Sequence, residues 1–210
     1  MVHHNYSNNV FVNCPFDSEY EPILQAVLFC LVRFGLTPRI ATERNDGAET
    51  RIDKIRELIE CSKYSVHDLS RCQARVVGEH YRLNMPFELG MDFGCKFFGG
   101  EPHDQKVILI LEEERYRYQA ALSDLAGSDI SYHEANYELA VRKVRNWITS
   151  FGGFEIVGAS KILSEYEDFQ EWYIERQIAA GFSEDDALDF TTSELLEAMQ
   201  IWVAEGRPRE

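Results

Sequence analysis

Short runs of apolar and β-branched residues recur along the first two thirds of the chain, and longer segments with helical spacing separate them. The run at Asn9–Cys14 reads NVFVNC, is ended by Pro15, and predicts a buried strand. The run KVILIL at Lys106–Leu111 has the near-continuous apolar character of a strand in a sheet covered on both faces. Weaker strands are expected at Leu36–Thr42 and Tyr64–Leu69.

The segments between these strands predict helices. Aliphatic residues recur at steps of three and four over Tyr20–Phe34, so we expect a core helix there. Thr50 begins a sequence that resembles a capping box, with Asp53 in place of the usual glutamate, and it should open a second helix. A third helix is expected to start with Asn84 as its cap, and a fourth covers Tyr137–Trp147.

The alternation of strands and helices from Asn9 to Ile148 predicts an α/β fold with parallel strands and right-handed crossovers. A flavodoxin-like parallel sheet of order 2-1-3-4-5, with helices on both faces, accommodates the predicted strands. The pattern between residues 112 and 136 predicts no regular element. Phe151–Gly153 is the expected end of this α/β domain, which then comprises residues 1–150.

Residues 154–210 are expected to form a C-terminal helical extension, with helices at Ser160–Ala180 and Ser193–Ala204. Its aromatic residues either pack back onto the sheet domain or lie in an interface, with a partner or with a second copy of the chain. Binding of a partner would make the chain a protein-assembly module. These residues are Tyr166, Trp172, Tyr173 and Trp202.

The charge of the chain narrows the classes of partner. The formal net charge is −15, whereas nucleic-acid binding is built from clustered Lys and Arg. The same charge repels anionic membrane surfaces, and no apolar stretch approaches the ~20 residues that a membrane span needs. We therefore expect neither a nucleic-acid nor a membrane partner.

The cysteines indicate a reducing compartment. Five are scattered along the chain, an odd number without any CxxC pair. His67 and His80 lie near Cys72, but this spacing fits no zinc site. No metal is therefore expected. The polar N-terminus has no apolar targeting run, so the expected location of the protein is cytoplasmic.

The predicted sheet order also predicts where a ligand binds. The chain reverses direction between the first and third strands, and ligands of such folds bind in the crevice at the carboxyl ends of those strands. The loops Pro15–Ser18 and Asp68–Ser70 should border this crevice. The helix after the third strand starts at the same edge, so Glu88 in its first turn is expected to point toward the crevice.

The segment from Asn84 to Gly90 reads NMPFELG and resembles the corresponding segment of nucleoside 2′-deoxyribosyltransferases and their relatives. In those proteins Glu-Leu-Gly opens the helix after the third strand, and the glutamate is the nucleophile or stabilises the sugar cation. The resemblance implies this role for Glu88. The family is structurally close to TIR-like NAD-cleaving domains, which makes NAD a candidate substrate.

The resemblance also includes the strand at Val10–Val12, the turn at Pro15–Phe16 and the acid Asp68, so it spans roughly Asn9–Leu111. One position departs from the family pattern. The transferases usually carry an aspartate six positions before the glutamate, and this chain has Arg82 there. Because that acid helps to handle the base, the departure argues against transfer between bases and affects simple hydrolysis less.

Glycosidic cleavage defines the roles of the candidate residues. A carboxylate stabilises or traps the oxocarbenium-like sugar, and a second acid protonates the leaving group. Glu88 is the candidate for the first role, and Asp68 for the partner acid or for an acceptor of a sugar hydroxyl. Asp17 and Ser18 are candidates for binding sugar or phosphate oxygens, and Arg51 for holding a phosphate.

Most of these residues also have a purely structural interpretation. Asp17 and Ser18 can cap the following helix, and Asp68 can form an Asx turn. The aromatic residues Phe16 and Phe87 are either core residues or platforms on which a base stacks. The residues expected to contact the substrate are Pro15, Phe16, Asp17, Ser18, Arg51, Ser70, Asn84 and Phe87.

The leading functional hypothesis is therefore an N-glycosidase, or a nucleoside deoxyribosyltransferase-like hydrolase, that acts on a nucleoside, a nucleotide or NAD. It needs no cofactor, and relatives of this kind often complete their sites across a dimer, so a homo-oligomer is expected. A non-catalytic nucleotide-binding sensor is the alternative that Arg82 favours, since part of the transferase machinery is missing.

Overall fold

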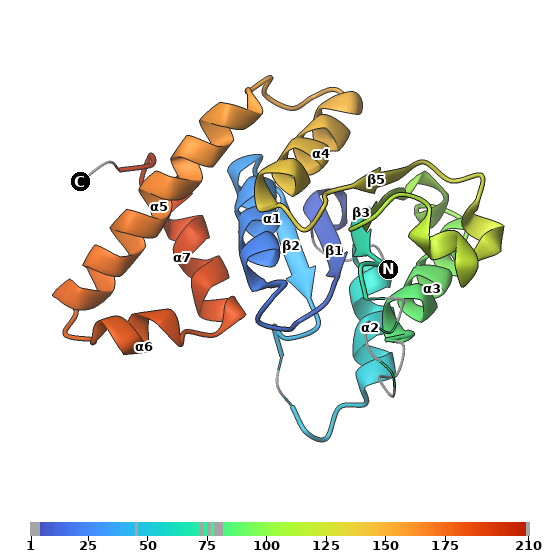
Figure 1. The fold of residues 1–210 in the computed structure, drawn as a ribbon, viewed down its shortest axis with the longest axis horizontal. Helices are drawn as coiled ribbons and strands as arrows, with labels where there is room; N and C mark the ends of the chain where they lie inside the picture. Colours follow the sequence, from blue (N-terminus) through green and yellow to red (C-terminus); the bar gives the residue numbers. More distant parts are fainter. Residues whose placement is uncertain (1–4, 45, 72–73, 75–76, 78–81, 209–210) are drawn as a thin grey trace.

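The computed structural model describes residues 5–44, 46–71, 74, 77 and 82–208. Five strands form one parallel sheet in the order β2-β1-β3-β4-β5, which confirms the predicted flavodoxin-like α/β fold (Figure 1). The strands are β1 (Asn9–Asn13), β2 (Thr37–Ile40), β3 (Tyr64–Asp68), β4 (Val107–Glu112) and β5 (Ile130–Tyr132). The helices are α1 (Glu21–Arg33), α2 (Arg51–Glu60), α3 (Asn84–Phe98), α4 (Tyr137–Ser150), α5 (Ala159–Ala179), α6 (Glu184–Leu188) and α7 (Thr192–Ala204).

Helices cover both faces of the sheet. α1 and α4 lie on one face, and α2 and α3 lie on the other (Figure 1). Strand β1 shows why both faces need a helical cover, because successive side chains of a strand point to opposite faces of the sheet. Val10 and Val12 pack in the cluster that α1 and α4 form, whereas Phe11 packs with Ile55 and Leu58 of α2. The strand is paired with β2 on one side and β3 on the other, so it is central and fully buried.

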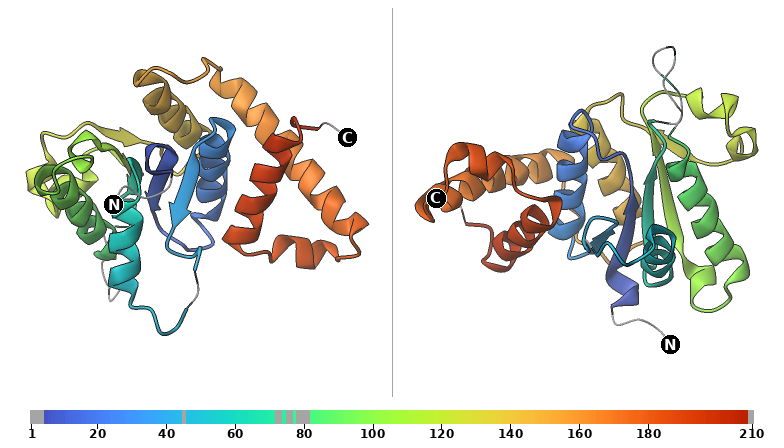
Figure 2. Two further views of the ribbon diagram at one scale, coloured as in Figure 1. Left: turned by 180° about the vertical axis from the view of Figure 1, so that it is seen from behind. Right: turned by 90° about the horizontal axis from the view of Figure 1, so that it is seen from below.

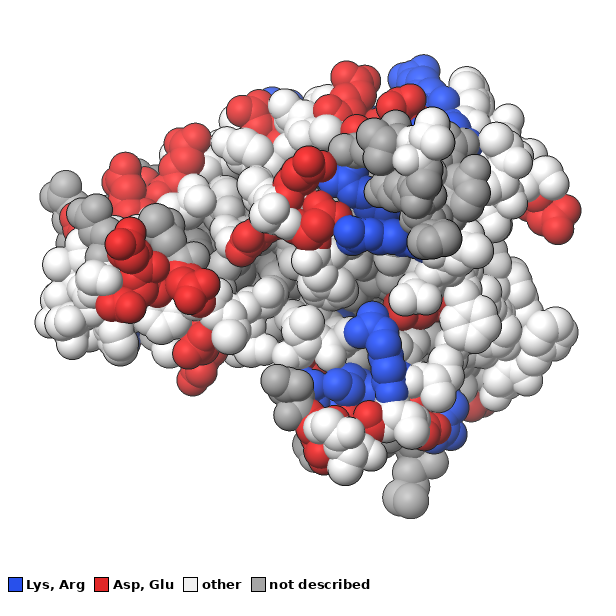
Figure 3. All heavy atoms as spheres, turned by 60° about the horizontal axis from the view of Figure 1, so that its bottom comes forward, with Lys and Arg blue, Asp and Glu red and all other residues white. Residues whose placement is uncertain are grey.

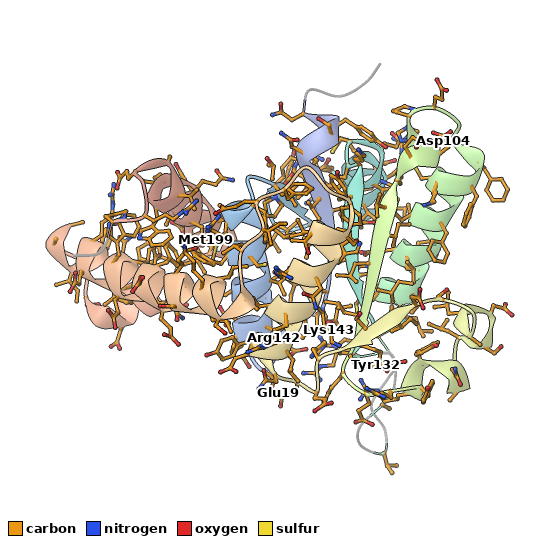
Figure 4. All side chains as sticks on the ribbon, turned by 90° about the horizontal axis from the view of Figure 1, so that it is seen from above. Glu19, Asp104, Tyr132, Arg142, Lys143 and Met199 are labelled. Carbon is orange, nitrogen blue, oxygen red and sulfur yellow. The ribbon has the colours of Figure 1, made fainter. Side chains whose placement is uncertain are left out.

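The C-terminal extension packs on α1, on the side away from the sheet (Figure 2). The ring of Phe29 in α1 has its centroid 5.5 Å from that of Phe169 and 5.6 Å from that of Trp202. Met199, which Figure 4 labels, is buried in the same cluster. The hydrophobic core of the α/β domain thus continues into the extension without interruption.

The aromatic residues of the extension pack back onto the sheet domain, as one of the two sequence interpretations expected. Tyr166, Tyr173 and Trp202 are buried, and Trp172 packs half-buried against them. The other interpretation, an exposed aromatic surface for a partner, is wrong for these residues. The expected exposure of these residues was the reason for the assembly-module hypothesis, and the structure does not provide it.

A buried ion pair also joins the extension to the α/β domain. Arg33, in the last turn of α1, donates through Nε to Glu165 of α5, and both side chains are buried. Arg33 also donates from Nη1 to Glu155 at 2.9 Å, but that carboxylate is exposed. The chain between the two parts turns at Gly152 and Gly153, whose φ angles of 73° and 80° lie in the region that glycine adopts without strain.

Helix starts differ in part from the sequence expectations. Thr50 caps α2 as predicted, since its hydroxyl oxygen accepts from the Asp53 N–H at 3.4 Å. Asn84 is not a cap, because α3 begins at this residue and Leu83 occupies the cap position. Asp17 accepts from the Tyr20 N–H at 3.1 Å, one turn before α1 begins, so it supports the turn that leads into α1 without being its cap residue.

The segment between residues 112 and 136 contains the edge strand β5, the fifth strand of the predicted order, whose residues show no clear periodic pattern. Two short 3-10 turns, Arg117–Ala120 and Ser123–Leu125, precede it. A strand of three residues is too short to show an alternating pattern. Within the ranges that the structure describes, no helix is long and apolar enough to cross a membrane.

Candidate active site

The carboxyl ends of the parallel strands meet at one edge of the sheet. Glu19 in the loop after β1 and Tyr132 at the end of β5 lie toward this edge, and Asp104 lies at the opposite edge (Figure 4). A groove of about 360 Å³ opens at the carboxyl edge, which is within the range of small-molecule sites, about 300–1,000 Å³. Its walls come from the end of β1 and the starts of α2 and α3. The lining residues are Asn13, Cys14, Pro15, Phe16, Arg51, Arg82, Leu83, Asn84 and Met85.

The groove carries local positive charge on an acidic protein. Lys and Arg side chains lie on both sides of a hollow in the face that Figure 3 shows. Arg51 at the start of α2 and Arg82 before α3 both line the groove, with side chains that are 57% and 51% exposed. Guanidinium groups form strong, geometrically specific hydrogen bonds with phosphate. The groove therefore suits a ligand that carries an anionic group.

Glu88 lies one helical turn beyond the groove-lining Asn84 and is only 5% exposed. Its Oε1 is 3.5 Å from Nη2 of Arg51. Burial raises the pKa of the groove-lining Cys14 thiol, and the charges of Asp68 and Glu88 raise this pKa further. The carboxylate of Glu88 is thus beside the lining residue Arg51 and within electrostatic reach of Cys14, but Glu88 is not itself among the groove-lining residues, whereas the sequence argument expected it to point into the crevice.

Two effects oppose each other at the Glu88 carboxylate. Burial raises its pKa, and the Arg51 cation acts in the opposite direction, with a net upward shift. A titratable group that is desolvated beside a specific charge partner in a cleft is typical of functional sites. Glu88 is buried because it lies on the inner side of α3. The residues on this side recur at steps of three and four and are Met85, Glu88, Leu89 and Asp92.

A buried polar network lies beyond Glu88 along α3. Asp92 accepts from His67 Nε2 at 3.0 Å and pairs with Lys106 Nζ at 3.1 Å, and Ser65 also donates to it. Burial acts to raise the pKa of Asp92, but the hydrogen bond from His67 and the Lys106 charge lower it overall. Sequence reasoning missed this network. The carboxylates at positions 88 and 92, four apart on an otherwise apolar helix side, were the available signal.

Asp68 has a different environment from the one expected for a partner acid. It is fully buried, and its Oδ2 lies 2.6 Å from the Tyr20 hydroxyl and 2.9 Å from His133 Nε2. Its Oδ1 accepts from the Ser70 N–H at 2.9 Å and from the Ser70 hydroxyl. Burial raises the pKa of Asp68, but the hydrogen bonds from His133, Ser70 and Tyr20 lower this pKa overall.

The roles proposed for Asp68 and Ser70 therefore need correction. An ionised carboxylate has no proton to give to a leaving group, and the bonds from Tyr20, His133 and Ser70 occupy both Asp68 oxygens. Neither Asp68 nor Ser70 is among the groove-lining residues. The two side chains instead join β3 to the helix start at Tyr20 and to the segment after β5.

Asp17 is held in the rim of the groove by two arginines. Arg71 donates to it from Nη2 at 3.1 Å, and Arg82 from Nη1 at 3.0 Å. The hydrogen bond from Arg71 lowers the pKa of Asp17. Its carboxylate therefore positions the Arg82 side chain, which differs from the expected direct contact with sugar oxygens. Ser18 is exposed and is not among the groove-lining residues.

The aromatic residues near the groove are not core residues. Phe16 is 41% exposed and lines the groove, so it is available for stacking on a base. Phe87 is 59% exposed but is not among the lining residues. Among the described residues, no group of three or more His, Cys, Asp and Glu is placed to hold a metal ion, and Cys72 and His80 lie outside the described residues.

Comparison of the chain with protein-family models found no match. Neither a curated protein nor a solved structure matched it.

Proposed function

We propose that this protein breaks the N-glycosidic bond of a phosphate-bearing nucleotide or of NAD, with Glu88 as the nucleophile or as the stabiliser of the sugar cation. The observation that carries the proposal is the buried Glu88 carboxylate, paired with Arg51 at a groove on the carboxyl edge of the sheet. The resemblance of the NMPFELG segment to nucleoside 2′-deoxyribosyltransferases supports the same role. Arg51 and Arg82 support a phosphate in the substrate.

The surroundings of Glu88 favour a particular leaving group. None of the described residues that line the groove carries a carboxylate, and Asp68 is fully buried with both oxygens engaged by other residues. Ordinary bases depart only with help from a proton donor. Nicotinamide departs from NAD as a neutral molecule, because the pyridinium nitrogen takes the bonding electron pair and loses its charge. The arrangement of acids therefore favours NAD among the candidate substrates.

The test is to measure base release from NAD and from the ribo- and deoxyribonucleoside 5′-monophosphates by liquid chromatography. We expect nicotinamide release from NAD at a rate that scales with protein concentration and exceeds base release from the monophosphates. If none of these substrates released a base, the proposal would be contradicted. A thermal shift with NAD in the absence of product would instead support the nucleotide sensor, for which Arg82 at the family's aspartate position is the specific observation.

Replacing Arg51 with glutamine should move the acid limb of the pH–rate profile to higher pH. Glu88 must be ionised to attack or stabilise the sugar, so activity falls as the pH drops through its pKa. Because Arg51 lowers the pKa of Glu88, the loss of that cation raises the pKa further. The measurement is kcat/KM for base release from pH 4 to 8. The matched control is Arg56→Gln on the same helix, which pairs with the exposed Asp53, and its acid limb should not move. An acid limb that stays in place in Arg51→Gln would remove this ion pair from the mechanism.

We further propose a cytoplasmic location and a homo-oligomer. Cys14, Cys30 and Cys61 are free and buried, which supports a reducing compartment. The outer side of α3 exposes Phe97 and Phe98, with 65% and 89% of each residue accessible, which supports a contact between copies of the chain.

A further inference from the structure

Asn13 is the last residue of β1 and joins this strand to α3. It is 3% exposed, and its Nδ2 donates to the Met85 carbonyl at 2.9 Å and meets His67 Nδ1 at 2.9 Å. An amide NH2 group has two hydrogens, so both are used. Met85 lies three residues before Glu88, so this bond fixes the turn of α3 that presents the carboxylate.

The bonds of Asn13 determine which way its amide faces. The Met85 carbonyl only accepts hydrogen bonds, so the NH2 group of Asn13 and not its oxygen must face it. His67 Nδ1 then accepts the second hydrogen, and His67 Nε2 carries the proton that it donates to Asp92. A flipped amide would place two oxygens against each other at Met85 and is excluded.

The remaining polar atom of the side chain is Oδ1. Asn13 lines the groove, and none of the described residues donates a hydrogen bond to its Oδ1. Asn13 Oδ1 is not among the buried polar atoms that lack a partner, so water reaches it in the free protein and a ligand in the groove can take the place of that water. Since the NH2 group is turned toward α3 and β3, the acceptor is left for the groove.

We propose that Asn13 Oδ1 accepts a hydrogen bond from a ribose hydroxyl of the substrate and thereby makes the site selective for that hydroxyl. This inference rests on the proposed function for the identity of the ligand, a nucleotide. The same side chain positions Glu88 through Met85, so it aligns the sugar with the carboxylate. Loss of the hydroxyl leaves the oxygen unpaired, which should lower affinity about tenfold.

The test compares the affinities of several ligands with and without Asn13. Calorimetry measures these affinities in the Glu88→Gln variant, which should bind the ligands without cleaving them. The probes are NAD, the four ribonucleoside 5′-monophosphates, and the 2′-deoxy and 3′-deoxy forms of the monophosphate that binds most tightly. Removal of the recognised hydroxyl should weaken binding about tenfold when Asn13 is present and less than twofold in Asn13→Ala. A merely structural role would weaken all ligands equally and leave the ratio between them unchanged.

Asn13→Asp provides the second variant. It keeps an oxygen toward the groove and should keep the discrimination between ligands, although its other oxygen faces the Met85 carbonyl and should lower the melting temperature. If Asn13→Ala and its parent distinguish equally between ligands with and without the hydroxyl, the inference is overturned. It is also overturned if none of the probes shows saturable binding. Base release by the wild type is scored separately. Release with no Asn13 effect rejects only this inference, and an Asn13 effect with no release rejects only the proposed function.

Discussion

Replacing Glu88 with glutamine is expected to slow base release at least about 1,000-fold, because the variant loses the buried carboxylate that pairs with the groove-lining Arg51. Glutamine has nearly the same shape but can neither form an ester with the sugar nor balance its positive charge. The measurement is steady-state base release from NAD at neutral pH over a range of NAD concentrations. The loss should appear in kcat more than in KM, since the interaction forms in the transition state.

The variant should remain folded, which makes the kinetic result interpretable. Burial raises the pKa of Glu88, so a neutral side chain is accepted at this position and the melting temperature should not fall. Glu49→Gln makes the same change of charge in the loop before α2, where Glu49 pairs with Arg44 and Lys54 away from the groove. Its rate should stay within about twofold of wild type. Equal base release by Glu88→Gln and wild type would exclude Glu88 from the reaction.

Replacing Arg33 with methionine is expected to lower the free energy of unfolding by about 3–5 kcal/mol. The side chains of Arg33 and Glu165 are only 1% and 6% exposed, so the substitution leaves a buried carboxylate without its main partner. The remaining cations are more distant, with Lys161 Nζ at 3.9 Å and Arg207 Nη1 at 3.7 Å from Glu165 Oε1. Equilibrium unfolding in urea measures the change.

Two further variants test the cause of this loss. Glu155→Gln removes the other carboxylate that Arg33 contacts, but that side chain is 58% exposed, so the loss of stability should be small beside that of Arg33→Met. The double variant Arg33→Met with Glu165→Met removes both buried charges and should recover most of the lost stability. A double variant as unstable as Arg33→Met would show that packing, and not the unpaired charge, causes the effect.

The fold was predictable because its signals are local and repeated. The apolar runs at Asn9–Cys14 and Lys106–Leu111, separated by helical patterns, are enough to place strands and to imply a parallel sheet. The same logic placed Glu88 at the carboxyl edge, since the helix after the third strand must start there. The predicted order implied a fifth strand, but its residues could not be placed, because three residues at the end of an irregular segment show no periodicity.

The surroundings of each candidate residue were not predictable in the same way. Asp68 ends its strand as expected, but its partners Tyr20 and His133 lie 48 and 65 positions away in the sequence, and only the folded chain shows that they close it off. Asn13 was overlooked for a related reason, since an asparagine within an apolar run indicates a strand end and gives no information about Met85 or His67.

Helix α1 is buried from Ala26 to Arg33, with the sheet on one side and the extension on the other. It therefore has no side on which substitutions are free, and a substitution in it must fit both the sheet and residues 154–210. A homologue that lacks the extension should carry a polar side chain where this protein has the buried Phe29, and it would have no buried carboxylate for an arginine at position 33 to pair with. An apolar aromatic residue at position 29 would then indicate, from sequence alone, that this face of α1 is covered.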